Sequence, residues 1–172
     1  MSDPTLAEGG QYLTFHLDHE HFAIEISRIR EVLAYTAPTK VPRTPPFMTG
    51  VINLRGQVVP VIDLRLKVGL PTLAPSRDTC IIILEVMLDG ELTVVGALAD
   101  AVQEVVDISR SQVAPPPRMG SRIETTFIRG MARREDQFVV LLDIDALLGA
   151  REIVVAPVAP GSETTGAGGA VA

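Results

Sequence analysis

Short runs of alternating apolar and polar residues predict that most of the chain forms β-strands. Residues 12–17 alternate, a polar turn follows at 18–20, and residues 21–26 alternate again, which is the pattern of two strands joined by a turn. Further Val- and Ile-rich runs of similar length are bounded by Gly, Pro, Asn or Asp, as strands commonly are. The pattern predicts an all-β fold with short helices.

Residues 50–65 are predicted to form a hairpin of two apolar strands joined by a tight turn. Asn53 at the first turn position and Gly56 at the fourth are typical of a type I turn closed by a left-handed glycine, the three-residue hairpin loop. That geometry would place Leu54 and Arg55 in solvent at the hairpin tip. A hairpin requires neither residue type there, so we predict that both contact a partner.

Two short helices are predicted from their start and stop residues. Ser27 can cap a helical segment that reaches about Leu33. Asp63 can cap a second helix, which ends at Gly69 and is stopped by Pro71.

The second half of the chain repeats the first. When the chain is slid over itself, two ordered blocks of matching residues coincide, one around the hairpin and its following helix and one around residue 31. The matching pairs include Gly50 with Gly130, Asp63 with Asp143, and Glu31 with Glu104. We therefore predict two similar lobes, at about residues 11–70 and 79–150, with an apolar groove between them.

The two lobes differ at the tips of their matching hairpins. Residues 53–56 are Asn-Leu-Arg-Gly, whereas residues 133–136 are Arg-Arg-Glu-Asp. The tip of the first lobe is therefore not a requirement of the fold, which favours a binding role for Leu54 and Arg55.

The two ends of the chain differ in composition from the rest. Residues 1–10 are small and polar, and residues 156–172 are rich in Ala, Gly and Pro. Neither segment carries enough large apolar surface to pack. We expect disordered tails on either side of one domain at residues 11–150.

Composition narrows the function classes. Of the 172 residues, 47% are apolar, which is enough for a well-buried core. The formal net charge of −6 argues against a nucleic-acid binder, which needs a basic surface. No apolar run is long enough to span a membrane. The single Cys80 cannot form an internal disulfide, so a reduced cytoplasm is expected.

The sequence contains no motif typical of catalysis or of a cofactor site. A Gly-rich phosphate loop, a nucleophile elbow and a paired-His zinc motif are all missing, so we predict neither an enzyme nor a cofactor. His16, His19 and His21 cluster around one turn. A solvated turn explains them, and the alternative is a metal-binding protein that uses the three histidines as ligands.

Glu31 has two interpretations. It is either a solvated side chain on a short helix or the partner of Arg55 in an ion pair at one end of the groove. An exposed ion pair adds little stability, so such a pair would serve mainly to orient Arg55 for a partner.

The Asn-Leu-Arg-Gly turn with its flanking strands closely resembles the CheW family, the scaffold proteins of bacterial chemotaxis. Further segments resemble the same family in the same order: residues 12–15, 29–32, 102–106, the Pro-rich loop and residues 141–144. The resemblance covers about residues 11–148. It implies two SH3-like five-stranded β-barrel lobes that share a hydrophobic core, and no catalysis.

The resemblance also implies partners. Such an adaptor couples chemoreceptors, the methyl-accepting chemotaxis proteins, to the regulatory domain of a CheA-type histidine kinase, and the cytoplasmic receptor tips dock a helix in the groove. The protein would be cytoplasmic and recruited to membrane-associated receptor arrays without inserting into the membrane. A scaffold of a type IV pilus or gliding pathway is the alternative within this family.

The residues carried over by motif form the expected binding site. The receptor-binding residues are Ile29, Glu31, Val32, Arg55 and Val102. At the hairpin tip, Leu54 and Arg55 are expected to contact the kinase or the receptor.

Overall fold

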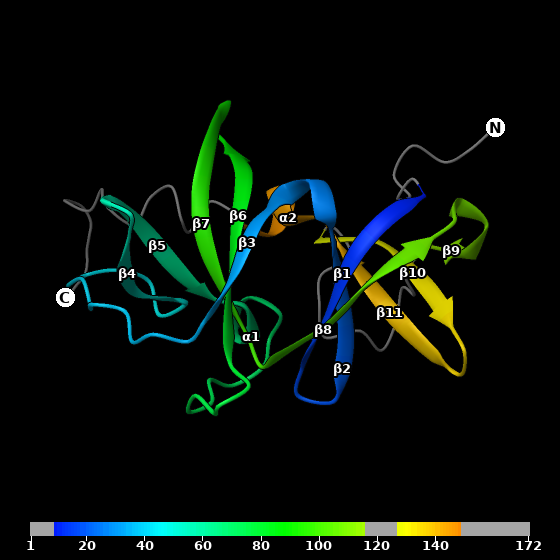
Figure 1. Ribbon diagram of the computed structural model, residues 1–172, viewed down its shortest axis with the longest axis horizontal. Helices are drawn as coiled ribbons and strands as arrows, with labels where there is room; N and C mark the ends of the chain where they lie inside the picture. Colours follow the sequence, from blue (N-terminus) through cyan, green and yellow to red (C-terminus); the bar gives the residue numbers. More distant parts are fainter. Residues whose placement is uncertain (1–8, 116–126, 149–172) are drawn as a thin grey trace.

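The computed structural model describes residues 9–115 and 127–148, which form two β-sheets that lie side by side (Figure 1). One sheet has six strands in the order β8-β1-β2-β11-β10-β9, and the other has five in the order β3-β6-β7-β5-β4. The six-stranded sheet contains β1 (Gly10–Leu17), β2 (Glu20–Glu25), β8 (Ala101–Ile108), β9 (Val113–Ala114), β10 (Ile128–Arg134) and β11 (Gln137–Leu142). The five-stranded sheet contains β3 (Ile29–Ala34), β4 (Met48–Leu54), β5 (Gln57–Asp63), β6 (Cys80–Leu88) and β7 (Glu91–Ala99).

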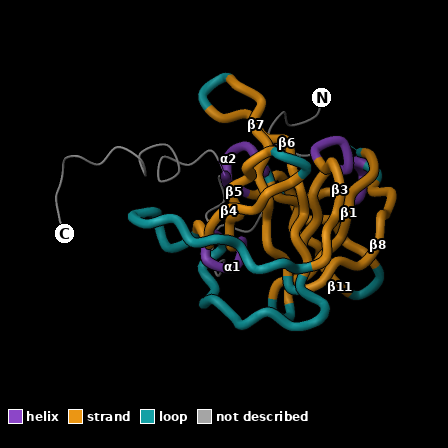
Figure 2. The backbone as a smooth tube through the Cα atoms, turned by 60° about the vertical axis from the view of Figure 1, so that its left-hand side comes forward, coloured by secondary structure: helices purple, strands orange, loops and turns teal. Residues whose placement is uncertain are grey.

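Helical segments are short and lie at the ends of strands, as the backbone view in Figure 2 shows. The two α-helices are α1 (Leu64–Lys67) and α2 (Ile144–Leu148), and the two 3-10 turns are η1 (Ile26–Arg28) and η2 (Arg110–Gln112). None of the helices in the described residues is long and apolar enough to cross a membrane.

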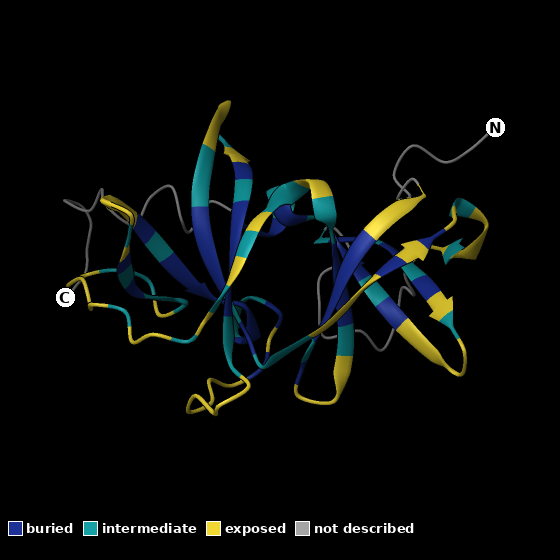
Figure 3. Cartoon of the chain, viewed as in Figure 1, coloured by how far each residue is buried: buried dark blue, intermediate teal, exposed yellow. Residues whose placement is uncertain are grey.

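Each sheet curls around an apolar cluster of its own, and a third, larger cluster lies between the sheets. Strand alternation separates the clusters, because successive side chains of a strand point to opposite faces. In β6, Ile81 and Ile83 belong to the cluster of the five-stranded sheet, while Ile82 and Leu84 belong to the shared cluster. Residues of both helices also join the shared cluster, among them Leu64 and Leu147. Figure 3 shows the buried residues along both sheets. The expected fold of two barrel lobes with a common core is confirmed.

The sheets do not follow the expected lobes at about residues 11–70 and 79–150. The hairpin β1–β2 belongs with β8 to β11, and the hairpin β6–β7 belongs with β3 to β5. The two halves of the sequence have therefore exchanged their first hairpins, so each barrel is built from both halves. The exchange follows from pairing across the halves: β2 runs parallel to β11, and β5 runs parallel to β7. Parallel neighbours cannot be joined by a tight turn, so the pairing partner comes from elsewhere in the chain.

The repeat itself is visible in the backbone. The N–H of Asp63 donates to the carbonyl of Phe47, and the N–H of Asp143 donates in the same way to the carbonyl of Phe127. Both aspartates then precede a short helix that packs into the shared cluster. The correspondence between the halves therefore holds at the level of single hydrogen bonds.

One predicted helix is present and the other is not. Asp63 caps α1, and its Oδ1 accepts a hydrogen bond from the N–H of Arg65. The helix expected from Ser27 to about Leu33 is wrong: a single 3-10 turn is followed directly by strand β3. Pairing with β6 decides this segment, because it completes the sheet, whereas a short isolated helix is only marginally stable.

The tip of the hairpin β4–β5 also differs from its prediction. Leu54 pairs with Gln57, which leaves a loop of only Arg55 and Gly56. Their φ angles are 51° and 86°, and positive φ at both positions is typical of a type I′ turn rather than the expected type I turn. The type I′ turn matches the twist of the flanking strands. Oδ1 of Asn53 accepts the N–H of Gly56 at 2.8 Å and supports the turn.

Candidate functional site

Glu31 and Arg55 form an ion pair between strand β3 and the β4–β5 turn. Nη2 of Arg55 contacts Oε2 of Glu31, and Nη1 lies 3.5 Å from Oε1. The Arg55 side chain remains 71% exposed, whereas that of Glu31 is 29% exposed. Of the two interpretations of Glu31, the structure therefore shows the ion pair. The carboxylate holds the guanidinium in one orientation and leaves its outer side open to solvent.

The electrostatics of the pair follow from this contact. The hydrogen bond from Arg55 lowers the pKa of the Glu31 carboxyl below its usual value of 4.5, with smaller effects from the charges of Arg55 and Arg30. The same hydrogen bond raises the pKa of Arg55 above its usual value. Both groups are therefore charged at neutral pH.

The ion pair also closes a barrel. Strands β3 and β4 are the two edges of the five-stranded sheet, so a contact from β3 to the turn after β4 joins its edges. A second link lies nearby in sequence, where Thr39 and Val51 exchange two backbone hydrogen bonds of 2.8 and 2.9 Å. Gly50 is required beside it, because a Cβ at this position would lie 2.3 Å from the carbonyl oxygen of Thr39.

The residues predicted on β3 point to two different faces. Directly paired residues of a ladder share a face, so Glu31 lies on the face of Ile83 and Val32 lies on the face of Ile82. A register shift between Ile29 and Glu31 puts Ile29 on the same face as Val32. Ile29 packs against the shared cluster, while Val32 is 40% exposed.

The two remaining predicted residues, Leu54 and Val102, have different surroundings. Val102 lies on β8, in the other sheet, where it pairs with Phe15 and packs against the shared cluster. Ile29 and Val102 thus border the same cluster from different sheets. Leu54 is not fully in solvent as expected: it is partly buried against the apolar cluster of the five-stranded barrel. Arg55 is the exposed residue of this tip.

The second barrel has a related but weaker ion pair. Arg134 precedes the β10–β11 turn, and its Nη1 lies 3.9 Å from Oε2 of Glu104 on β8. Glu104 is the repeat partner of Glu31, yet its side chain is 66% exposed. Both barrels therefore have an ion pair between an edge strand and the hairpin turn. Only in the first barrel is the arginine held closely by its carboxylate while its side chain remains mostly exposed.

A buried polar network that the sequence did not predict joins the two sheets. Arg65 on α1 is 6% exposed. Its Nη1 lies 2.5 Å from Oδ2 of Asp100, and its Nε donates to the carbonyl of Pro71 at 2.7 Å. The same Oδ2 of Asp100 accepts the N–H of Asp18 from the β1–β2 turn. The repeat offered no signal for it, because residue 145, which corresponds to Arg65, is an aspartate.

The histidines lie around the β1–β2 turn as expected. His16 and His21 are cross-strand partners with ring centroids 6.1 Å apart, and Nδ1 of His21 lies 3.1 Å from Oε1 of Gln103. Within residues 9–115 and 127–148, no group of three His, Cys, Asp or Glu side chains is arranged to hold a metal ion. The structure gives the metal-binding alternative no support.

Known proteins are similar to this chain in sequence and in fold. Residues 11–152 match the family model described as the CheW-like domain. The chain is 32% identical to the chemotaxis protein CheW of Klebsiella aerogenes, over 86% of each chain. It is also 32% identical to the chemotaxis protein CheW of Rhizobium meliloti, over 86% of this chain and 93% of the relative. The crystal structure of the scaffolding protein TtCheW from Thermoanaerobacter tengcongensis superposes with a TM-score of 0.74 and 33% identity, covering 84% of this chain and 95% of that one.

Proposed function

The chain belongs to the CheW family, and on that premise we propose that it is a non-catalytic adaptor of a bacterial chemosensory array, which couples chemoreceptors to a CheA-type histidine kinase. Relatives named as chemotaxis proteins and a structural neighbour named as a scaffolding protein support this role. In the proposed role the protein is cytoplasmic and reaches the membrane only through its receptors.

The observation that carries the proposal is the ion pair of Glu31 with Arg55. A cation that is held by a fixed carboxylate yet remains mostly exposed is preorganised for a partner, because less side-chain entropy is lost on binding. We assign Arg55 to the receptor contact and Glu31 to its orientation. The receptor tip would supply an acceptor group for the guanidinium.

The apolar part of the proposed receptor site consists of Ile29, Val32 and Val102. Ile29 and Val102 border the shared cluster from the two sheets, and Val32 adds exposed apolar surface on the same face of β3 as Ile29. This arrangement suits the apolar face of an amphipathic helix laid across the junction of the sheets.

The kinase contact is assigned to the ends of the two barrels. The β4–β5 hairpin carries Val58 with 69% exposure, and the matching β10–β11 hairpin carries Phe138 with 56% exposure. Exposed large apolar residues at both ends fit an adaptor that contacts neighbours on two sides. Leu54, at the same tip as Val58, supports this surface from within the barrel.

The test compares binding by two charge reversals on the full chain. Arg55→Glu should weaken binding of a receptor cytoplasmic fragment by at least about tenfold, because it removes the cation and places a second carboxylate beside Glu31. Arg77→Glu is the matched control, because Arg77 is also exposed but lies in the loop before β6. Equal binding by Arg55→Glu and the control would remove Arg55 from the receptor site.

A further inference from the structure

The hairpin β6–β7 extends beyond the strands on either side of it. On one side, β3 pairs with β6 only as far as Leu84. On the other side, β5 pairs with β7 only from Gly96 onward. Residues 85–88 and 91–94 therefore pair with each other alone, and the extension rises above the barrel with exposed residues at its end (Figures 1 and 3).

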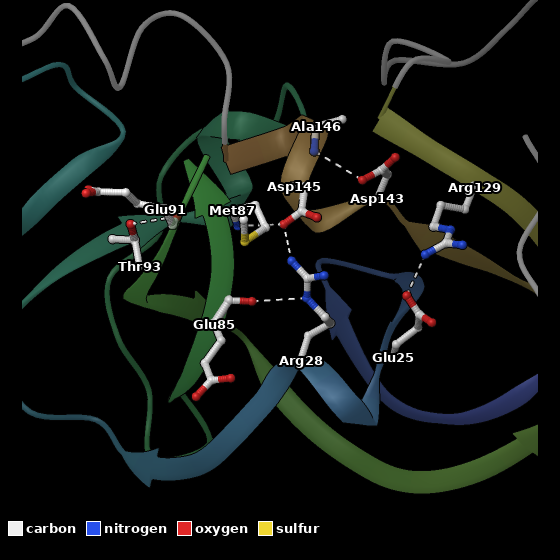
Figure 4. Close-up of polar contacts among 10 residues, drawn as sticks. All are labelled: Glu25, Arg28, Glu85, Met87, Glu91, Thr93, Arg129, Asp143, Asp145 and Ala146. Atoms are coloured by element: carbon white, nitrogen blue, oxygen red, sulfur yellow. Dashed lines mark hydrogen bonds and ion pairs between the residues drawn. The ribbon is translucent and has the colours of Figure 1, made fainter. Parts of the chain in front are cut away.

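The outer edge of β6 in this extension is covered by side chains. Nε of Arg28 donates to the carbonyl of Glu85 at 3.0 Å, and Oδ1 of Asp145 accepts the N–H of Met87 at 2.9 Å. Arg28 and Asp145 also form an ion pair with each other (Figure 4). A 3-10 turn and helix α2 thus supply the partners that a neighbouring strand would otherwise provide.

These two bonds fix the direction of the backbone groups on β7. In an antiparallel pair, directly opposite residues either bond to each other or both point away. Because Glu85 and Met87 point away from β7, their partners Val94 and Leu92 point away from β6. The N–H and C=O of Leu92 and Val94 therefore face the outer edge of β7.

Pro60 explains why β5 does not cover this edge. The parallel ladder between β5 and β7 reaches Val61 opposite Gly96. To continue toward the end of the hairpin, residue 60 would have to donate its backbone N–H to the carbonyl of Val94. Proline has no N–H to donate. Among the described residues, no hydrogen bond reaches the outward backbone groups of Leu92 or Val94. Within residues 9–115 and 127–148, nothing pairs with the edge of β7 from Glu91 to Val95.

The two faces beside the open edge differ in chemistry. Met87 and Leu92 are a cross-strand pair on one face, with 43% and 61% exposure. Glu91 lies on the other face, and Asp89 lies in the turn. Neither acid has an ion-pair partner among the described residues. A strand added here would meet apolar side chains on one face and uncompensated negative charge on the other.

We propose that the outer edge of β7 binds an extended peptide of a partner protein, one in which apolar and basic residues alternate. The peptide adds a strand and bonds to the backbone of Leu92 and Val94. Its apolar side chains lie beside Met87 and Leu92, and its Lys or Arg side chains lie beside Glu91. Charge complementarity selects a basic segment, because both free side chains at the end of the hairpin are acidic and the whole chain carries −6.

The test uses an acetylated and amidated hexapeptide of alternating valine and lysine, titrated into the full ¹⁵N-labelled chain. The amide signals of Leu92 and Val94 should shift most, and a peptide with glutamate in place of lysine should leave them unchanged. Sedimentation of the chain alone should show no dimer that involves this edge. Shifts confined to other residues, or a concentration-dependent dimer lost in Leu92→Pro, would overturn the proposal.

Two variants separate the backbone contact from the side-chain contact. Leu92→Pro removes an outward N–H that has no partner within the described fold, so the hairpin should remain folded, while peptide affinity falls by about tenfold or more. Leu92→Ala keeps the N–H and should lose less affinity. The circular dichroism spectra of Leu92→Pro and Leu92→Ala show whether both variants are folded. Equal affinity for the peptide in folded Leu92→Pro and wild type would contradict strand addition.

The charge preference is tested by Glu91→Lys. This change should lower the affinity for the lysine peptide and raise the affinity for the glutamate peptide, each by about fivefold. An unchanged preference would contradict the assigned role of Glu91. The receptor site is a separate surface, so Arg55→Glu should bind the peptide as wild type does, and the two proposals can fail independently.

Discussion

Glu31 and Arg55 join the two edge strands of a curled five-stranded sheet, although 23 residues separate them in the chain. The pair does two things at once. It closes the barrel between β3 and the β4–β5 turn, and it orients an exposed guanidinium. The type I′ turn sets Arg55 at the tip with a φ of 51°, where its side chain reaches Glu31 and is still mostly exposed.

The pKa of Glu31 should report the ion pair directly. Arg55→Ala should raise the pKa of the Glu31 carboxyl toward 4.5, because its largest stabilising contact with the charged form is lost. Because the folded pKa is depressed, the contribution of the pair is present above pH 4.5 and is lost as the pH falls through the folded value. NMR titration of the Glu31 side-chain carboxyl in the wild type and in the variant measures the pKa. Arg30→Ala is the control and should change the pKa less.

Loss of Arg65 should destabilise the fold. Arg65→Met would leave Asp100 partly buried without its cation, which costs about 3 kcal/mol in the free energy of unfolding. Urea unfolding followed by circular dichroism measures the change. Arg77→Met, at an exposed position, should unfold like the wild type. An Arg65→Met variant as stable as this control would show that the network does not hold the two sheets together.

The apolar residues of the proposed receptor site should separate into two classes. Val32→Glu should weaken receptor binding by about tenfold while the chain remains folded, since Val32 is already 40% exposed. Ile29→Glu should also lower the melting temperature, because Ile29 packs against the shared cluster. Binding isotherms and thermal unfolding of both variants are the measurements. Normal receptor binding by Val32→Glu would restrict the site to the other face of β3.

The sequence predicted the positions of strands and helices better than it predicted which strands pair. Alternation, turn residues and the cap at Asp63 are local signals, and they located the hairpin β4–β5 and helix α1. The exchange of hairpins β1–β2 and β6–β7 between the barrels depends on pairing between distant strands, which no local pattern records. The helix predicted after Ser27 was wrong for the same reason, because pairing with strand β6 determines the conformation of this segment.

The candidate site shows the same limit. The match of Glu31 with Glu104 and the unusual tip at Arg55 were enough to suggest an ion pair, and the pair is present. The partial burial of Leu54 could not be predicted from the turn residues alone, since it depends on the curl of the sheet. The network of Arg65 escaped prediction because its partners, Asp18 and Asp100, come from segments far apart in sequence.

The central claim is that this chain couples receptors to a kinase, and phosphorylation in a reconstituted array tests it most directly. Receptor-containing membranes and the CheA-type kinase are assayed with no added chain, with the wild type and with Arg55→Glu. Kinase autophosphorylation should respond to receptor ligand with the wild type, should not respond without the chain, and should respond little with Arg55→Glu. The same ligand response without the chain would contradict the adaptor function. A full response with Arg55→Glu would contradict the assigned site.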